Sequence, residues 1–242
     1  IEYLSRFCKP ITSIHFSDPI FNLNKKRTLE LCAKLTQFKD KLIFSVDTRV
    51  DVLDHEVVKA MINAGIAFFR LGFEDVQDNI LRDVHKGIRS IMALDAVKII
   101  RQESSSALIH AYWLTGLPGS TKQSLFENTM ALRNLISEGS VDVVGNKIFV
   151  PYPGTPYYHS PGQYGMTLLT QDWSLYDRLS FPVYHLNNLS EFEIYYGFLF
   201  MEAVQLQAYL DKLGGEPSFP PISLDYVYSS YVDHKSERSF ML

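Results

Sequence analysis

The sequence has 242 residues, enough for one sizeable domain with at most a short appendage. Its 46% hydrophobic and 21% charged residues are typical of a soluble globular protein and exclude an intrinsically disordered chain. The formal net charge of −4 does not favour a nucleic-acid surface, and no apolar run approaches the roughly 18 residues that a membrane-spanning helix needs. Two cysteines, Cys8 and Cys32, are too few for a disulfide scaffold, which favours a reducing, cytoplasmic compartment.

Short apolar runs and amphipathic stretches alternate along the first 150 residues. In chain order the patterns predict strand 11–16, helix 25–38, strand 42–47, helix 54–64, strand 67–72, a short helical turn from Asp75, helix 90–102, strand 108–114, helix 122–136 and strand 141–150. Asp54 is expected to cap the second helix, and either Ser120 or Thr121 is expected to cap the helix that begins at residue 122.

The spacing of these elements indicates the fold class. The strands begin roughly 25 to 41 residues apart, the length of a strand–helix crossover unit, and such crossovers make parallel sheets. The strands are also continuously apolar, as strands buried on both faces of a parallel sheet are. At least five units without a hairpin signal favour a barrel or partial barrel, with a doubly wound sheet as the alternative.

The composition changes after Pro161. Residues 171–181 carry no periodic pattern, residues 191–213 predict one long helix, and a tyrosine-rich tail follows. No linker is polar enough to mark an independent domain. We therefore expect an α/β barrel over 1–160 and a helical, aromatic-rich C-terminal extension over 161–242 that packs on it. Tyr226 to Tyr231 are expected to serve packing or an interface, with a lid over the barrel mouth as the alternative.

Ligands bind at the carboxyl ends of parallel strands in α/β folds, so chemistry is expected in the loops that follow the strands. Those loops carry Asp18, Arg49, Glu74 and two turns rich in glycine and proline. Each feature alone has a structural explanation. Asp18 can cap a turn, Asp47 can pair with Arg49, and Glu74 suits the first turn of a helix. Likewise, His15 and His110 are expected to be core histidines.

Four segments, taken together, resemble in order and spacing the strand-end motifs of the radical S-adenosylmethionine (SAM) enzymes. They are VDTRVD at 46–51, FRLGFE at 69–74, LTGLPGST at 114–121 and VPYPGTP at 150–156. The resemblance covers about residues 11–158 and is nearest to the branch with tRNA methylthiotransferases, cobalamin-dependent methyltransferases and cyclases. It implies a partial (β/α)6 barrel, TIM-like and open on one side.

The resemblance also implies cofactors, partners and site residues. The cofactors are SAM and a 4Fe-4S cluster that cleaves it to a 5′-deoxyadenosyl radical, with cobalamin held by an upstream domain. The partners are a small-molecule or peptide substrate and a reducing donor such as flavodoxin or ferredoxin. By position, Ser17 and Asp18 contact the methionine amino group, Arg49 binds the methionine carboxylate and Glu74 accepts ribose hydrogen bonds. The residues expected along the adenine are Leu114, Gly116, Leu117, Val150 and Pro151.

The sequence departs from the family pattern in two places. The CxxxCxxC motif that holds the cluster is absent, and the spacing of Cys8 and Cys32 does not replace it. Because residue 1 already lies close to the second strand of the family, we expect an upstream segment to supply the cluster ligands. Ser120 stands where the family has a glutamate, and a serine there can cap the helix. No catalytic residue and no metal ligand are assigned within this sequence.

Two other functions stay open. One is a degenerate barrel that binds SAM or a partner without a cluster. The other is a conventional barrel lyase in which Lys147, on the last strand, forms a Schiff base with a carbonyl substrate.

Overall fold

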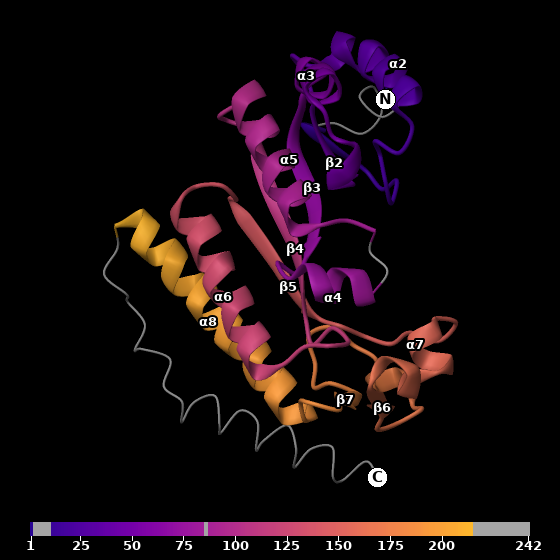
Figure 1. The fold of residues 1–242 in the computed structure, drawn as a ribbon. Coiled ribbons are helices and arrows are strands. Elements are labelled where there is room, and N and C mark those ends of the chain that lie inside the picture. Colours follow the sequence, from indigo (N-terminus) through magenta and orange to yellow (C-terminus); the bar gives the residue numbers. More distant parts are fainter. Residues whose placement is uncertain (2–10, 85–86, 215–242) are drawn as a thin grey trace. The chain divides into compact units, whose positions relative to one another are not determined.

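The computed structural model describes residues 1, 11–84 and 87–214, and Figure 1 shows its fold. Five strands form one parallel sheet whose order follows the chain: β1 (Ser13–Phe16), β2 (Ile43–Thr48), β3 (Ile66–Glu74), β4 (Leu108–Thr115) and β5 (Val143–Ile148). His15 pairs with Ser45 across β1 and β2, and Asp47 pairs with Arg70 across β2 and β3. The predicted fold class, an α/β partial barrel, is confirmed.

Helices connect successive strands, as the predicted crossovers require. They are α2 (Lys25–Leu35), α3 (His55–Asn63), α4 (Asp78–Asp83), α5 (Ser90–Glu103) and α6 (Lys122–Ser137). Asp54 caps α3 as predicted, because its side chain accepts a hydrogen bond from the Val57 N–H at 2.9 Å. The cap of α6 is Thr121, in a reciprocal capping box with Ser124. The alternative cap, Ser120, is wrong, because this residue is buried one position before the cap.

The chain divides into two compact units, each of which is described by itself. Among the described residues, unit 1 comprises Ile1, 11–73, Ile88–Tyr112 and Ser140–Val144, and unit 2 comprises 74–84, Gly87, Trp113–Gly139 and 145–214. Residues 161–214 thus share a compact unit with the end of β4 and with α6. The domain boundary expected at 160/161 stays a prediction.

In unit 1 the strands alternate between a fully buried face and a half-exposed face. Phe44 and Val46 on β2, Phe69 and Leu71 on β3, and Ala111 on β4 are completely buried. Successive side chains of a strand point to opposite faces, so the residues between them line the other face. Those residues are mostly polar.

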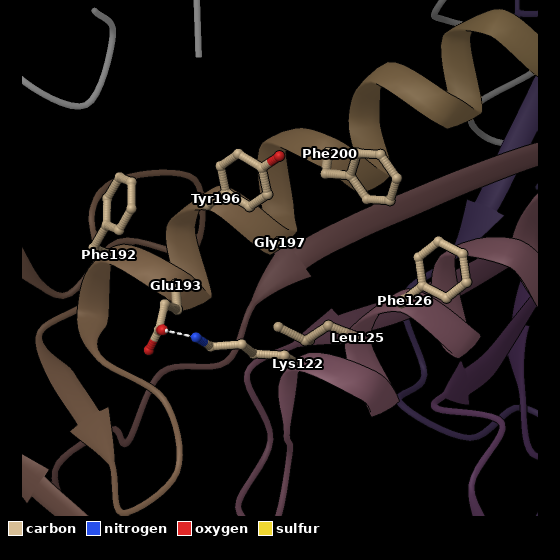
Figure 2. A pocket seen from close by; sticks show the side chains of 8 residues that line it. All are labelled: Lys122, Leu125, Phe126, Phe192, Glu193, Tyr196, Gly197 and Phe200. Carbon is tan, nitrogen blue, oxygen red and sulfur yellow. Dashed lines mark ion pairs between the residues drawn. The ribbon is translucent and has the colours of Figure 1, made fainter. Parts of the chain in front are cut away.

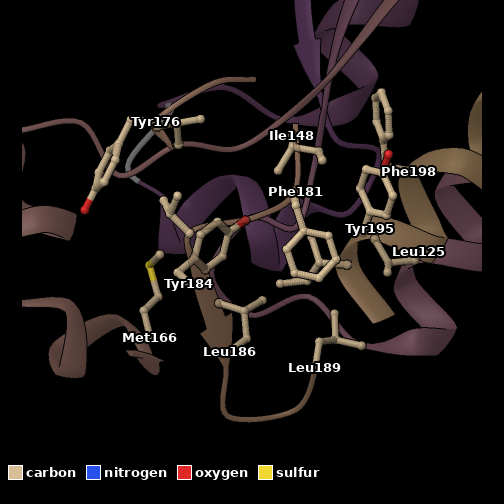
Figure 3. Packing of buried hydrophobic residues seen from close by; sticks show 13 residues of the cluster. Leu125, Ile148, Met166, Tyr176, Phe181, Tyr184, Leu186, Leu189, Tyr195 and Phe198 are labelled. Carbon is tan, nitrogen blue, oxygen red and sulfur yellow. The ribbon is translucent and has the colours of Figure 1, made fainter. Parts of the chain in front are cut away.

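The core of unit 2 is aromatic and is formed mainly by the segment that follows β5 (Figure 3). A two-stranded antiparallel hairpin, β6 (Met166–Leu168) and β7 (Tyr184–Leu186), places Tyr184 in its centre. The sequence did not predict this hairpin, because each strand has three residues and residues 169–183 separate them. Two short helical turns, α7 (Pro156–His159) and a 3₁₀ turn at Pro161–Tyr164, precede it.

The long helix predicted at 191–213 is confirmed as α8 (Glu191–Leu213). Ser190 and Glu193 form its capping box, and Gly214 ends it in a left-handed conformation. Within unit 2, α8 lies along α6 (Figure 1). The close approach depends on Gly197, since a β-carbon at this position would lie 2.7 Å from Leu125 Cδ1.

None of the described helices combines the length and the hydropathy needed to cross a membrane. Cys8 and the tail from Tyr226 to Tyr231 lie outside the described residues.

Candidate functional site

The residues predicted to bind SAM all lie at or just after the carboxyl ends of β1 to β5. Unit 1 contains Ser17, Asp18 and Arg49. Unit 2 contains Glu74, Leu114, Gly116, Leu117, Val150 and Pro151. The predicted residues therefore fall into two groups, one in each unit.

Arg49 follows β2 directly and holds a carboxylate with two parallel hydrogen bonds. Its Nε and Nη2 donate to the Asp51 carboxylate at 2.9 and 2.8 Å, and these bonds raise the pKa of the guanidinium. The pairing of Arg49 with Asp47 that the sequence left open is absent from the described residues, since Asp51 takes that place. The bonds to Asp51 use one edge of the guanidinium, so N–H groups of Nη1 and Nη2 remain as donors for a second acceptor.

The loop after β1 clamps the backbone of Arg49. Asn22 is buried, and its side chain accepts a hydrogen bond from the Arg49 N–H and donates one to the Arg49 carbonyl, both at 3.0 Å. The N–H of Phe21 also donates to the Asp47 carbonyl at 2.9 Å. Asn22 is a positioning residue that the sequence did not reveal, because its partner lies 27 positions away and no local pattern links the two.

Asp18 and Ser17 lie in the same loop. The Asp18 carboxylate accepts a hydrogen bond from Arg27 Nη2 at 2.8 Å, and both side chains are about half exposed. Ser17 is exposed at the end of β1. The turn that follows Asp18 is present at Pro19 and Ile20. A solvent-exposed ion pair of this kind is weak, so Asp18 can exchange Arg27 for a ligand at little cost.

Glu74 ends β3 in a strained backbone conformation. Its φ of 65° is the only positive value of a non-glycine residue among those that the structure describes. Such a conformation typically costs on the order of 1–3 kcal/mol and persists only where the surroundings hold it. The half-buried side chain of Glu74 is thereby held at the end of the strand.

Hydrogen bonds of the next residue, Asp75, stabilise the turn that follows Glu74. Asp75 is buried, and its carboxylate accepts hydrogen bonds from Asn128 Nδ2 at 2.5 Å and from the Gln77 N–H at 2.7 Å. Asn128 also accepts a hydrogen bond from the Val76 N–H at 2.9 Å. Burial raises the pKa of Asp75 to about 6 although these hydrogen bonds oppose the shift. The sequence did not reveal this pair, because Asn128 looks like an ordinary residue of helix α6.

The glycine turn after β4 is covered by the C-terminal segment of unit 2. The Tyr184 hydroxyl donates to the Gly116 carbonyl at 2.6 Å, and complete burial raises the pKa of this hydroxyl far above its ordinary value. Gly116 has a φ of 81°, and a β-carbon there would lie 2.6 Å from both the Tyr184 hydroxyl and Ile194 Cγ2. Protein atoms thus fill the side-chain space of Gly116, while Leu117 is buried and Leu114 half-buried.

Val150 and Pro151 are both buried where the chain leaves β5. The Phe149 N–H donates to the Thr115 carbonyl at 2.9 Å, so the chain after β5 stays beside the end of β4. Within unit 2 the predicted adenine-binding residues of the two strands therefore lie next to each other. Whether they contact adenine stays a prediction.

The described residues do not fit an iron–sulfur cluster. Among them, no group of three or more His, Cys, Asp or Glu side chains could hold a metal ion. Cys32 is buried in α2, and its burial raises the pKa of the thiol to about 11, which disfavours the thiolate that ligates iron. We therefore assign no step to a cluster held by this part of the chain.

A hollow of about 460 Å³ lies between α6 and α8 in unit 2 (Figure 2). Its lining is mostly aromatic, with Phe126 stacked on Phe200 at a ring distance of 6.4 Å and Tyr196 stacked on Phe200 at the same distance. At its edge, Lys122 and Glu193 form an ion pair at 2.5 Å. None of the predicted site residues lines it.

The alternative Schiff-base lysine, Lys147, is half-buried on β5. Its charge lies near the Glu202 carboxylate of α8, whose pKa is raised by burial although Asn146 and Lys147 oppose the shift. The lyase interpretation stays a prediction.

No protein-family model matches the sequence. Over 187 residues the chain is 28% identical to an uncharacterised methyltransferase of Pyrococcus horikoshii, an alignment that covers 76% of this chain and 38% of that protein. The chain therefore spans less than half the length of this relative.

Two solved structures are similar over most of the described fold. One is the radical SAM methyltransferase TsrM of Kitasatospora setae with cobalamin and a 4Fe-4S cluster bound, with a TM-score of 0.59, 19% identity, and coverage of 71% of this chain and 35% of that one. The fold is that of the radical SAM enzymes. The other is the cobalamin-dependent SAM radical enzyme OxsB, with a TM-score of 0.56, 15% identity, and coverage of 93% and 39%. The resemblance predicted from four strand-end segments is confirmed at the level of the fold.

Proposed function

We propose that this chain is the SAM-binding barrel core of a radical SAM enzyme, a transferase whose reaction begins with a 5′-deoxyadenosyl radical. The observation that carries the proposal is the geometry of Arg49. At the end of β2, its guanidinium already binds a carboxylate, that of Asp51, through two parallel hydrogen bonds. The fold similarity to TsrM and OxsB and the sequence similarity to a methyltransferase support the same reading.

The proposed roles use the loops in chain order. Ser17 and Asp18 bind the methionine ammonium, and Arg49 binds the methionine carboxylate through the guanidinium edge that Asp51 does not use. Asn22 keeps Arg49 in place. Glu74 accepts hydrogen bonds from the ribose hydroxyls. In this proposal, the strained backbone of Glu74 holds the carboxylate in position for these bonds. The adenine lies along Leu114, Gly116, Leu117, Val150 and Pro151.

The cofactors of the whole enzyme extend the proposal. With two cysteines this sequence cannot provide three cysteine ligands, so in the proposal the cluster is bound by residues outside it. Cobalamin, a small-molecule or peptide substrate and a donor such as flavodoxin or ferredoxin complete the proposed system. The residues of this chain then bind SAM, orient it and exclude water from it.

Calorimetric titration of the full-length protein with SAM under anaerobic conditions tests the proposal. Arg49→Ala and Glu74→Gln each remove a charge-assisted hydrogen bond, which typically contributes about 1.5–3 kcal/mol. We therefore expect Kd for SAM to rise by about 10- to 150-fold in each variant. Arg82→Ala is the matched control, because Arg82 is 75% exposed and its ion-pair partner is its neighbour Asp83.

Unchanged affinity in Arg49→Ala, with the control also unchanged, contradicts the assignment of Arg49. A wild-type protein that binds no SAM at all contradicts the proposal as a whole.

A further inference from the structure

Unit 1 presents a row of polar side chains on the half-exposed face of its sheet. His15 on β1, Asp47 on β2, Arg70 on β3 and Tyr112 on β4 contribute one residue each. Asp47 and Arg70 are directly paired in register, and both alternate with residues of the fully buried face. His15 was expected to be a core histidine, but its side chain is 31% exposed, so that expectation is wrong.

Arg70 is the centre of this quartet. Its Nε lies 3.3 Å from Asp47 Oδ1, its Nη1 lies 2.9 Å from His15 Nε2, and its Nη2 donates to the Tyr112 hydroxyl. An arginine can only donate, so His15 Nε2 is the acceptor. The proton of the imidazole is then on Nδ1, which donates to Ser45 Oγ at 2.9 Å. The quartet thus places a guanidinium beside a carboxylate, and His15 Nε2 also lies 3.4 Å from Asp47 Oδ2.

The ion pair within the quartet is loose. Arg70 and Asp47 share one contact of 3.3 Å, whereas Arg49 and Asp51 share two at 2.9 and 2.8 Å. Asp47 Oδ1 is buried and accepts no hydrogen bond from any described residue. The side chains of Asp47 and Arg70 are 27% and 28% exposed. Both side chains are thus partly accessible on one face.

Aromatic rings continue the same face. His110 lies 4.5 Å from the Tyr112 ring, and Phe68 stacks on His110 at 6.0 Å with an interplanar angle of 19°. Phe68 and His110 precede Arg70 and Tyr112 by two residues on β3 and β4. These two rings therefore border the quartet on the side away from the carboxyl ends of the strands. A planar apolar group fits this surface.

We propose that the quartet binds the dipolar head of an α-amino acid substrate, with Asp47 accepting from its ammonium group and Arg70 and Tyr112 donating to its carboxylate. The planar side chain of that amino acid lies on Phe68 and His110. The site is separate from the proposed SAM residues, because Arg49 is two residues beyond Asp47 along the strand direction, about 7 Å at roughly 3.3 Å per residue. Only the assignment of this ligand as the substrate rests on the proposed function; the binding itself does not.

Calorimetry on the full-length protein with L-phenylalanine as the probe tests the site. Two analogues each lack one charge: 3-phenylpropionate has no ammonium group and phenethylamine has no carboxylate. We expect each analogue to bind at least about tenfold more weakly than L-phenylalanine, because each leaves one member of the Asp47–Arg70 pair without its ligand partner. Equal affinities for the three probes, or no binding of L-phenylalanine, would overturn the proposal.

Two variants test which charged group of the ligand Asp47 and Arg70 each bind. Asp47→Asn is expected to abolish the preference for L-phenylalanine over 3-phenylpropionate, and Arg70→Gln the preference over phenethylamine. A merely structural role would lower all three affinities together, and that result would also overturn the proposal. Asp95→Asn is the matched control, since Asp95 is 57% exposed and pairs with Lys98 on the same helix.

Saturating SAM distinguishes this site from the proposed cofactor site. Retention of L-phenylalanine binding supports a separate site, and its displacement by SAM overturns the proposal. Because the titrations without SAM do not involve Arg49, a failure of the SAM-binding proposal leaves their result unaffected.

Discussion

Gly116→Ala tests how the C-terminal segment covers the turn after β4. The substitution puts a β-carbon 2.6 Å from the Tyr184 hydroxyl and 2.6 Å from Ile194 Cγ2, and it places alanine at a φ of 81°. A left-handed alanine costs about 1–2 kcal/mol. The overlap in a packed core adds about 1–3 kcal/mol. The free energy of unfolding of the full-length protein, measured in urea, should fall by about 2–5 kcal/mol in total.

Gly154→Ala is the matched control for this experiment. Gly154 has a φ of 89°, but a β-carbon there meets nothing within 4 Å, so it carries the backbone cost alone. Gly116→Ala should also cost less in a Tyr184→Phe background, because one of the two overlaps is removed. Equal losses in Gly116→Ala and Gly154→Ala would refute the packing of Tyr184 and Ile194 over Gly116.

Three further predictions concern the loops that hold the candidate site. Because the pKa of Asp75 is about 6 when folded and ordinarily 3.8, protonation favours the folded state, and stability from this group rises as the pH falls from about 6 towards 4. The unfolding free energy of wild type relative to Asp75→Asn should therefore be about 2 kcal/mol higher at pH 4 than at pH 7.5, and a difference that does not change with pH contradicts this. Glu74→Gly should raise the unfolding free energy by about 1 kcal/mol by relieving the left-handed backbone, and a loss of stability argues against strain there. Asn22→Ala should lower it by about 1–3 kcal/mol, because the Arg49 N–H and carbonyl lose their partner; a change below about 0.5 kcal/mol would show that the clamp contributes little.

The sequence predicted the parts of the fold that local patterns encode. The strands of the parallel sheet, the Asp54 cap and the bounds of α8 follow from apolar periodicity and capping chemistry, which act within a few residues. The hairpin of β6 and β7 was missed, because three-residue strands separated by residues 169–183 are stabilised by the core around Tyr184 and not by a turn of their own.

The candidate site was predictable only in part for the same reason. Motif order pointed to Arg49 and Glu74, since strand ends carry chemistry in parallel α/β folds. The residues that hold them, Asn22 and Asn128, bond to partners 27 and more than 50 positions away, and nothing in a single sequence marks such pairs. Charge pairing was equally invisible, since Asp47 lies beside Arg70 and not Arg49.

The most direct test of the central claim is whether full-length protein, reconstituted with iron and sulfide and reduced without oxygen, converts SAM to 5′-deoxyadenosine. The account predicts that 5′-deoxyadenosine accumulates, and that Arg49→Ala needs about 10- to 150-fold more SAM to reach the same rate while Arg82→Ala behaves like wild type. Absence of 5′-deoxyadenosine from a protein shown to bind SAM would contradict radical chemistry and favour a SAM-binding barrel without a cluster.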